Sequence, residues 1–375
     1  MFSGQWVGTS SFGSFKGECL INIEPKNDVL GCYAYFFSGS VSYPSSCVYF
    51  EMPTSGDNHK LNVSNIQVMS SDFLAQPIHS TKDYISNSYG GIDFPESAIF
   101  ELSFDGDVLN LLITPSVGSV IYCVLENKCN KSYSSIGIDM TWVDFKSFVS
   151  SVDYRNVAFR GQAHNWPLRT SFHRNGRYDV QVYMNDDIPL LHRHISSMTK
   201  HYFNLSDPIH NGAFINLLQH HGYPTPLLDW SYSPYVAAFF AFSKLTQDEI
   251  DNSDASRKAR IFVFELDKWR REIWQFSNPF DCRLNISIGE YLTLNNPRAL
   301  PQQALTTFTN CCDMEGHLYK CGGETDRYLK AIDIPIKDAR NAMRDLAMMG
   351  ITYGALFPGI DGACQDFKEI KFPRT

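Results

Sequence analysis

The sequence predicts an α+β fold with two domains: a β-rich N-terminal sandwich or small barrel, followed by a mixed α+β domain. Two observations carry this prediction. Residues 1–130 are rich in β-branched and aromatic side chains separated by glycine-containing turns, whereas residues 140–375 alternate helix-start signals with short apolar runs. With 375 residues, the chain is long enough for each part to bury its own core.

Five segments of the N-terminal part have the composition of β-strands: residues 19–23, 30–37, 100–104, 108–114 and 119–125. Residues 100–104 alternate apolar and polar side chains, as a half-buried strand does. The Asp105-Gly106-Asp107 segment that follows favours a hairpin turn. Antiparallel packing is therefore expected.

After a polar connector at residues 126–135, helix signals begin. Thr141 and Asp144 have the spacing of a capping box, and we expect a helix to start there. Apolar residues then follow at steps of three and four, which predicts one amphipathic helix over residues 188–202. Residues 261–264 have the pattern of a buried strand, and residues 337–349 that of a last helix, which ends at Gly350.

Two helices are predicted to begin with a capping residue and a proline. Asp207-Pro208 opens a helix that should run to His221 and end at Gly222. Ser233-Pro234 opens a second helix, which is apolar nearly all round and should be buried.

The overall charge excludes some classes of function. A net charge of −8 without any basic run argues against a protein that mainly binds nucleic acid, since phosphate contacts need an excess of lysine and arginine. No apolar stretch is long enough to cross a membrane, and the first residues lack the pattern of a signal peptide. The ten cysteines contain no CxxC pair and suit reduced thiols, so we expect a cytoplasmic protein with no membrane partner and no metal.

The segment from Gln219 to Trp230 contains the first candidate site. His220 lies near the end of the predicted helix, and we expect its neighbour His221 to face the core. Asp229 stands in an apolar run, where an ionised carboxylate is costly unless it is paired. It either caps a turn, pairs with an arginine or acts in a functional site.

A second candidate site follows the apolar residues 157–159. Arg160 needs a partner after this buried strand, and its planar guanidinium suits either a carboxylate such as Asp229 or a phosphate. Gly161 allows close approach of a backbone or a ligand, and Gln162 adds a neutral donor and acceptor. Ser231 and Ser233 flank a helix start, where a hydroxyl caps free amides and those amides can also bind an anion; for Ser233, capping is favoured.

Together these motifs resemble the FRG domain, which is named after its Phe-Arg-Gly motif. The resemblance covers roughly residues 140 to 365. It rests on Phe159-Arg160-Gly161-Gln162, residues 166–174, Gln219 to Trp230, Ser233-Pro234 with the alanines that follow, Arg298 with Gln302, and residues 356–362. Ala304 and Thr306 depart from the family pattern, which tends to have glycine and phenylalanine there.

The resemblance extends, more distantly, to the ADP-ribosyltransferase fold. It implies an enzyme that takes NAD as substrate and modifies a macromolecular acceptor, either protein or nucleic acid, in a toxin or phage-defence setting. The implied catalytic residues are Arg160, His220, Asp229 and Gln302. The implied cofactor-binding residues are Arg160, Gly161, Gln162, Ser231 and Ser233.

Two points remain open at this stage. An amide at Gln302 stabilises a cationic transition state less well than a carboxylate would, and Glu290, Glu315 and Glu324 are possible substitutes. The alternative function is a non-catalytic module that binds a nucleotide or a protein. In that case Arg160, His220 and Asp229 would form a structural polar network.

Overall fold

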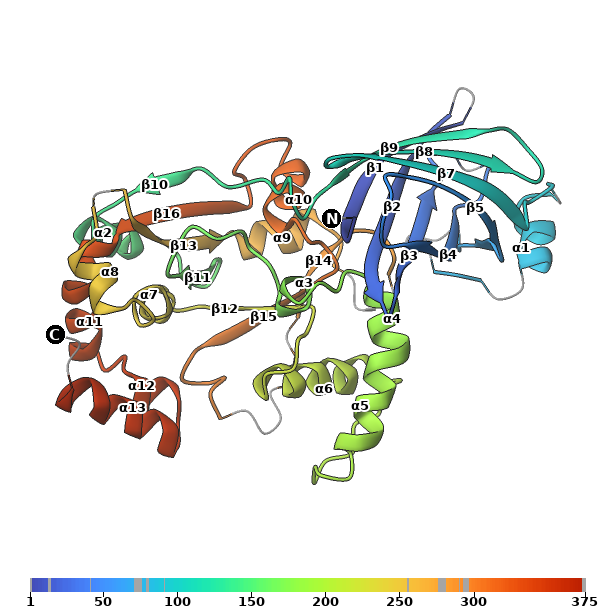
Figure 1. The fold of residues 1–375 in the computed structure, drawn as a ribbon. Helices are drawn as coiled ribbons and strands as arrows, with labels where there is room; N and C mark the ends of the chain where they lie inside the picture. The colour runs from blue at the N-terminus through green and yellow to red at the C-terminus, as the bar shows by residue number, and fades with distance from the viewer. Residues whose placement is uncertain are drawn as a thin grey trace.

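The computed structural model confirms the α+β class and contains two β-sheets that lie side by side (Figure 1). The structure describes residues 2–12, 15–40, 42–70, 76–78, 81–90, 92–254, 256–275, 281–289, 291–292 and 297–372.

The first sheet is antiparallel and has the order β5-β7-β8-β9-β1-β2-β3-β4-β6. Its elements, with one short helix, are β1 (Gly4–Phe12), β2 (Phe15–Lys26), β3 (Val29–Phe37), β4 (Ser46–Pro53), β5 (Asn58–Ser64), β6 (Gln67–Val68), α1 (Thr81–Ser88), β7 (Ser97–Asp105), β8 (Val108–Pro115) and β9 (Ile121–Asn127). The sheet curls into a half-barrel (Figure 1). Its apolar core includes Trp6, Phe50 and Phe100. The predicted hairpin is present, with Asp105 paired to Val108 and Gly106 at a φ of 59°.

The second sheet has the order β10-β16-β13-β11-β12-β15-β14 and is antiparallel except for the β10–β16 pair. Its strands are β10 (Gly137–Asp139), β11 (Ala158–Gln162), β12 (Leu227–Ser231), β13 (Lys258–Phe264), β14 (Ile286–Gly289), β15 (Ala304–Thr309) and β16 (Leu329–Pro335). The helical elements of this part are α2 (Trp142–Ser150), α3 (Ser171–Arg174), α4 (Val180–Val182), a π-helical turn (Tyr183–Asp187), α5 (Ile188–Ile195), α6 (Pro208–His220), α7 (Pro234–Phe242), α8 (Gln247–Asp251), α9 (Leu266–Glu272), α10 (Met314–Cys321), a 3-10 turn (Ile336–Asp338), α11 (Ala339–Met348), α12 (Tyr353–Leu356) and α13 (Ile360–Lys371).

Helices cover both faces of this second sheet. One face packs against α2, α7 and α11 through a core that includes Phe145, Phe159 and Phe239. The other packs against α9 and α10 through a core that includes Trp230 and Trp269. None of the helices in the described part of the chain is long and apolar enough to cross a membrane.

The predicted helix starts are confirmed. Thr141 and Asp144 form the capping box of α2, Asp207 caps α6, and Ser233 caps α7 by accepting from the N–H of Val236. Gly222, just after α6, has a φ of 85°, a conformation that suits glycine.

Three predictions about helices are wrong. The helix predicted over residues 337–349 is present as α11, but it is not the last, since α12 and α13 follow it. The amphipathic helix ends at Ile195, not at residue 202, and just beyond this end the hydroxyl of Ser197 donates to the carbonyl of His194. Met198 and Tyr202 are consequently 83% and 73% exposed. His221 was expected in the core but is exposed, because α6 ends at His220 and the chain turns away there.

Candidate functional site

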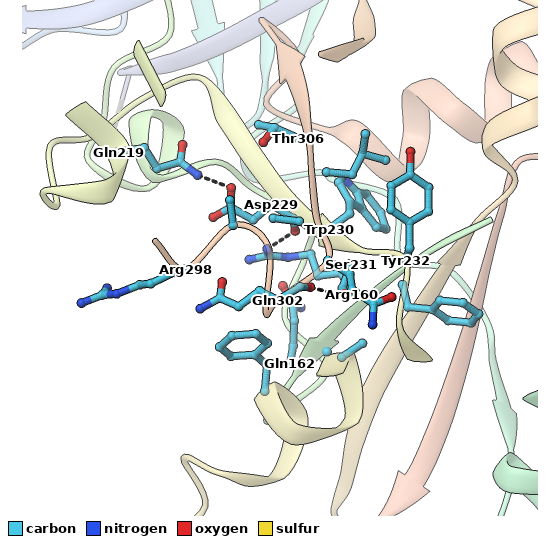
Figure 2. Close-up of a pocket in the computed structure, with 18 of the residues that line it drawn as sticks. Arg160, Gln162, Gln219, Asp229, Trp230, Ser231, Tyr232, Arg298, Gln302 and Thr306 are labelled. Carbon is cyan, nitrogen blue, oxygen red and sulfur yellow. Dashed lines mark hydrogen bonds between the residues drawn. The ribbon is translucent and has the colours of Figure 1, made fainter. Parts of the chain in front are cut away.

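A cleft of about 1080 Å³ opens beside the centre of the second sheet. It lies between the end of β11, the last turn of α6, β12, one side of α7 and the segment that leads into β15 (Figure 2). All but one of the site residues predicted from the sequence line it: Arg160, Gly161, Gln162, His220, Asp229, Ser231 and Gln302. Segments far apart in the sequence therefore converge on one cavity.

The cleft exists because β11 and β12 separate after one residue pair. They pair only at Phe159 and Ser231, so Arg160 and Asp229 stand where the strands have moved apart. The Arg160 side chain occupies part of this gap, and its Nη1 donates to the main-chain oxygen of Asp229 at 2.6 Å (Figure 2). The guanidinium thus satisfies a carbonyl that a neighbouring strand would otherwise bind.

Gly161 brings α7 against β11. A Cβ atom at this position would lie 1.8 Å from the main-chain oxygen of Ala237. The glycine therefore serves the close packing of helix on strand, and this packing places the cleft-lining side of α7 next to Arg160.

The guanidinium of Arg160 is only partly satisfied by the protein. Its Nε is buried and has no partner among the described residues. Burial lowers the pKa of Arg160 to about 10; Asp229 opposes this shift and Arg174 adds to it. Arg160 therefore remains a cation at neutral pH and keeps donor capacity for an anionic ligand.

Asp229 is held by a chain of two hydrogen bonds. Its Oδ1 accepts from Nε2 of Gln219 at 2.5 Å, and Oε1 of Gln219 accepts from the hydroxyl of the fully buried Thr225. Asp229 is exposed to the open cleft, but the protein atoms packed around its carboxylate raise its pKa by desolvation, while Arg160 and Gln219 favour its ionised form. Arg160 and Asp229 are thus neighbours, but the expected pairing of guanidinium and carboxylate is not what joins them: Arg160 binds the main chain of Asp229, and Gln219 binds the carboxylate.

His220 and Gln302 also line the cleft. Burial, followed by the charge of Arg298, lowers the pKa of His220, so this imidazole is mostly neutral at pH 7. Nε2 of Gln302 donates to the carbonyl of Leu356 at 3.0 Å. Gln302 therefore borders the cleft with an amide that already has a protein partner.

The two serines differ in their position. Oγ of Ser231 donates to the carbonyl of Gln302 at 2.7 Å and accepts from the N–H of Ser233 at 3.0 Å, which joins β12 to the segment before β15. Ser233 caps α7 and is absent from the cleft lining. Gln162 donates to the carbonyl of Trp166 at 2.7 Å and so fixes the turn after β11.

Two of the three glutamates considered as substitutes for Gln302 are described by the structure, and neither lines the cleft. Glu315 is buried and accepts from the N–H groups of Ser135 and Leu168 at 2.8 and 3.0 Å, and Glu324 lies on an exposed turn. Glu290 lies outside the described residues. In the described part of the chain, the cleft carboxylates are Asp229 and Glu249, and no cluster of three or more potential ligands suits a metal ion.

Sequence reasoning did not assign the cleft residues Arg174 and Lys244, nor Thr225, which is buried behind the cleft and holds Gln219. Thr225 falls within the segment from Gln219 to Trp230, so its place between the two prolines was the available signal. Nothing local marks Lys244, which lies just after the end of α7 and lines the cleft at a helical spacing from Ala237 and Phe240.

The comparison with known families agrees with this geometry. No curated protein and no solved structure matches the chain. Residues 155–250 match the model of the FRG domain, and this range includes Arg160, Gln219, Asp229 and α7. The segment around Arg298 and Gln302 completes the cleft from beyond the matched range. The chain thus contains an FRG domain at residues 155–250.

Proposed function

We propose that the cleft binds NAD and transfers its ADP-ribose to a macromolecular acceptor, a protein or a nucleic acid. One observation carries the proposal: Arg160 and Asp229 lie next to each other at the floor of a cleft large enough for a dinucleotide. The guanidinium suits a pyrophosphate, and the carboxylate suits the cationic ribose that forms when nicotinamide leaves.

The charge of the cleft supports an anionic ligand. Among the described residues, four cationic side chains line it, Arg160, Arg174, Lys244 and Arg298, against the two carboxylates of Asp229 and Glu249. Counted without histidines, the described lining therefore carries a net charge of +2, although the whole chain carries −8. A positive cleft on an acidic protein concentrates an anionic substrate at the site.

The proposed reaction breaks the bond between the ribose C1′ and the nicotinamide nitrogen, which leaves with the electron pair. A nucleophile of the acceptor then forms a bond to C1′ and releases its proton. Asp229 in its ionised form would stabilise the positive charge at C1′, with Gln219 holding the carboxylate in place. The neutral His220 at the edge of the cleft would take the acceptor's proton.

Ser231 and Gln302 would support this centre by position. Their hydrogen bond ties β12 to the segment that carries Arg298, so the two walls of the cleft keep a fixed separation. The amide of Gln302, held by Leu356, would border the ribose.

Reduced thiols suit the cytoplasm, where we place this activity; all ten cysteines are free. The proposed setting is that of a toxin or phage-defence effector.

A specific observation favours a second candidate, a binding module without turnover. Nη1 of Arg160, the carboxylate of Asp229 and the amide of Gln302 each have a protein partner without any ligand. Such a network would also fix the core of a nucleotide-binding or protein-binding domain.

The test uses NAD labelled in its adenylate phosphate, incubated with the full chain and a cell lysate. Arg160→Gln and Asp229→Asn are compared with Arg155→Gln, a matched control at a side chain that is 76% exposed on the same segment. We expect label to appear on macromolecules with the parent and the control, and at least 100-fold less with either cleft variant, roughly the loss on removing one transition-state contact. Bound but unconsumed NAD would favour the binding module, and absence of NAD binding would refute the transferase.

A further inference from the structure

Trp166 is a large aromatic side chain at the edge of the cleft, and much of its surface remains exposed. The indole lines the cavity and is 56% exposed. It belongs to the turn that follows β11 and precedes Pro167. An exposed indole on a cleft wall offers a flat apolar surface to whatever enters.

The main chain around Trp166 is rigidly held. Its N–H donates to the carbonyl of His164 at 2.8 Å, and its own carbonyl accepts from Gln162 at 2.7 Å. The His164 ring meets the indole edge-on, with ring centres 4.7 Å apart. The backbone is therefore fixed while the indole stays open, which lowers the entropic cost of stacking a ligand on it.

The position of this indole relative to Arg160 is set by the strand. Arg160 and Gln162 lie on the same side of β11, about 6.6 Å apart along it. Gln162 in turn holds the carbonyl of Trp166. A ligand that binds Arg160 and extends along β11 would thus reach the indole of Trp166 after roughly the length of one sugar ring.

Polar groups lie close to this aromatic surface. His164 pairs with Glu249 at 3.2 Å, and both line the cleft together with Lys244. This combination of a flat apolar face, a carboxylate and an imidazole suits a heteroaromatic ring with donors and acceptors on its edge.

We propose that Trp166 forms the nucleobase subsite of the cleft and stacks on the adenine ring of a dinucleotide whose pyrophosphate lies at Arg160. The inference rests on the proposed function and deepens it, because it assigns the orientation of NAD: adenine toward the turn after β11, and nicotinamide ribose toward Asp229. The subsite takes adenine nucleotides in general.

The test measures binding by isothermal titration calorimetry with three probes: NAD, ADP and inorganic pyrophosphate. Trp166→Ala should weaken ADP and NAD roughly tenfold, the effect typical of removing one base-stacking aromatic, and leave pyrophosphate unchanged. Trp166→Phe should restore most of the affinity. Trp274→Ala serves as the matched control, since Trp274 is 67% exposed and does not line the cleft.

The outcomes separate this inference from the proposed function. If Trp166→Ala binds ADP and NAD as tightly as the parent, the subsite is refuted and the NAD proposal stands. If Trp166→Ala weakens the binding of pyrophosphate as much as the binding of ADP, the indole affects the shape of the whole cleft, and the subsite is again refuted. If the parent binds none of the three probes, the proposed function fails and takes the inference with it.

Discussion

Glu24 of the half-barrel and Arg177 of the FRG domain form an ion pair, with Oε2 and Nε 2.8 Å apart. The same carboxylate accepts from the N–H groups of Tyr178 and Asp179. Nearby, Oδ2 of Asp179 accepts from Asn22 at 3.0 Å and from the hydroxyl of Tyr35 at 2.7 Å. The two sheets are therefore joined by a buried polar network rather than by a flexible linker.

Removing Glu24 should destabilise this contact. Glu24→Ala leaves two main-chain N–H groups without their acceptor and removes one of the two carboxylates that pair with Arg177, so we expect the free energy of unfolding to fall by about 2–3 kcal/mol. Urea unfolding followed by circular dichroism measures the change. Glu18→Ala is the matched control, because Glu18 also faces the other part of the chain, through Lys320, but in an exposed pair 3.8 Å apart. If Glu18→Ala also lowered the free energy of unfolding by more than about 1 kcal/mol, burial would not explain the effect of Glu24→Ala.

His173 should make the stability pH-dependent. It is 3% exposed, and burial lowers its pKa to about 3, against about 6.5 when unfolded. The unfolded state therefore binds the proton more tightly, so this stability is complete above pH 6.5 and is lost as the pH falls toward 3. Between pH 7 and pH 5 the loss should be about 2 kcal/mol.

Other groups titrate in the same range, so the effect of His173 is read as a difference between proteins. His173→Gln should lose about 2 kcal/mol less than the parent between pH 7 and pH 5 in urea unfolding. His194→Gln, at an exposed histidine, should follow the parent. Equal pH dependence of the parent and His173→Gln would contradict the assignment.

Thr225 should act as a positioning residue for Asp229. Thr225→Val keeps the shape of the side chain but removes the hydroxyl that orients Gln219, and through it the carboxylate. We expect kcat for ADP-ribose transfer to fall roughly tenfold, the equivalent of one hydrogen bond, with KM for NAD nearly unchanged. Thr225→Ser restores the hydroxyl and should recover activity. A rise in KM without a change in kcat would assign Thr225 to substrate binding instead.

The elements that could be predicted from the sequence are those with local causes. The capping residues Thr141, Asp207 and Ser233 correctly predicted three helix starts, because capping depends on neighbours within three residues. The need of Arg160 for a partner was also evident from the buried strand before it. Its actual partner, the main-chain oxygen of Asp229, was not, because it depends on where β11 and β12 separate.

The remaining features required the tertiary structure. The polar contact between Glu24 and Arg177 joins residues 153 positions apart, and no local pattern marks either side chain. The prediction that His221 faces the core failed for a local reason. Its spacing from Leu217 and Leu218 suits one face of a helix, but the helix ends one residue before it. Periodicity predicts which residues share a face only while the helix continues.

Gly161 should be intolerant of any side chain. Gly161→Ala would bring a methyl group against the main-chain oxygen of Ala237, and backbone cannot move aside as a flexible side chain can. We expect the free energy of unfolding to fall by about 1–3 kcal/mol, and NAD binding to weaken because α7 is displaced from Arg160. Gly31→Ala is the matched control, since an added Cβ there meets only side-chain atoms at 3.4 Å or more. Thermal unfolding and calorimetry on both variants measure these effects. If Gly161→Ala were as stable as Gly31→Ala, the close packing of α7 on β11 would not be what requires glycine.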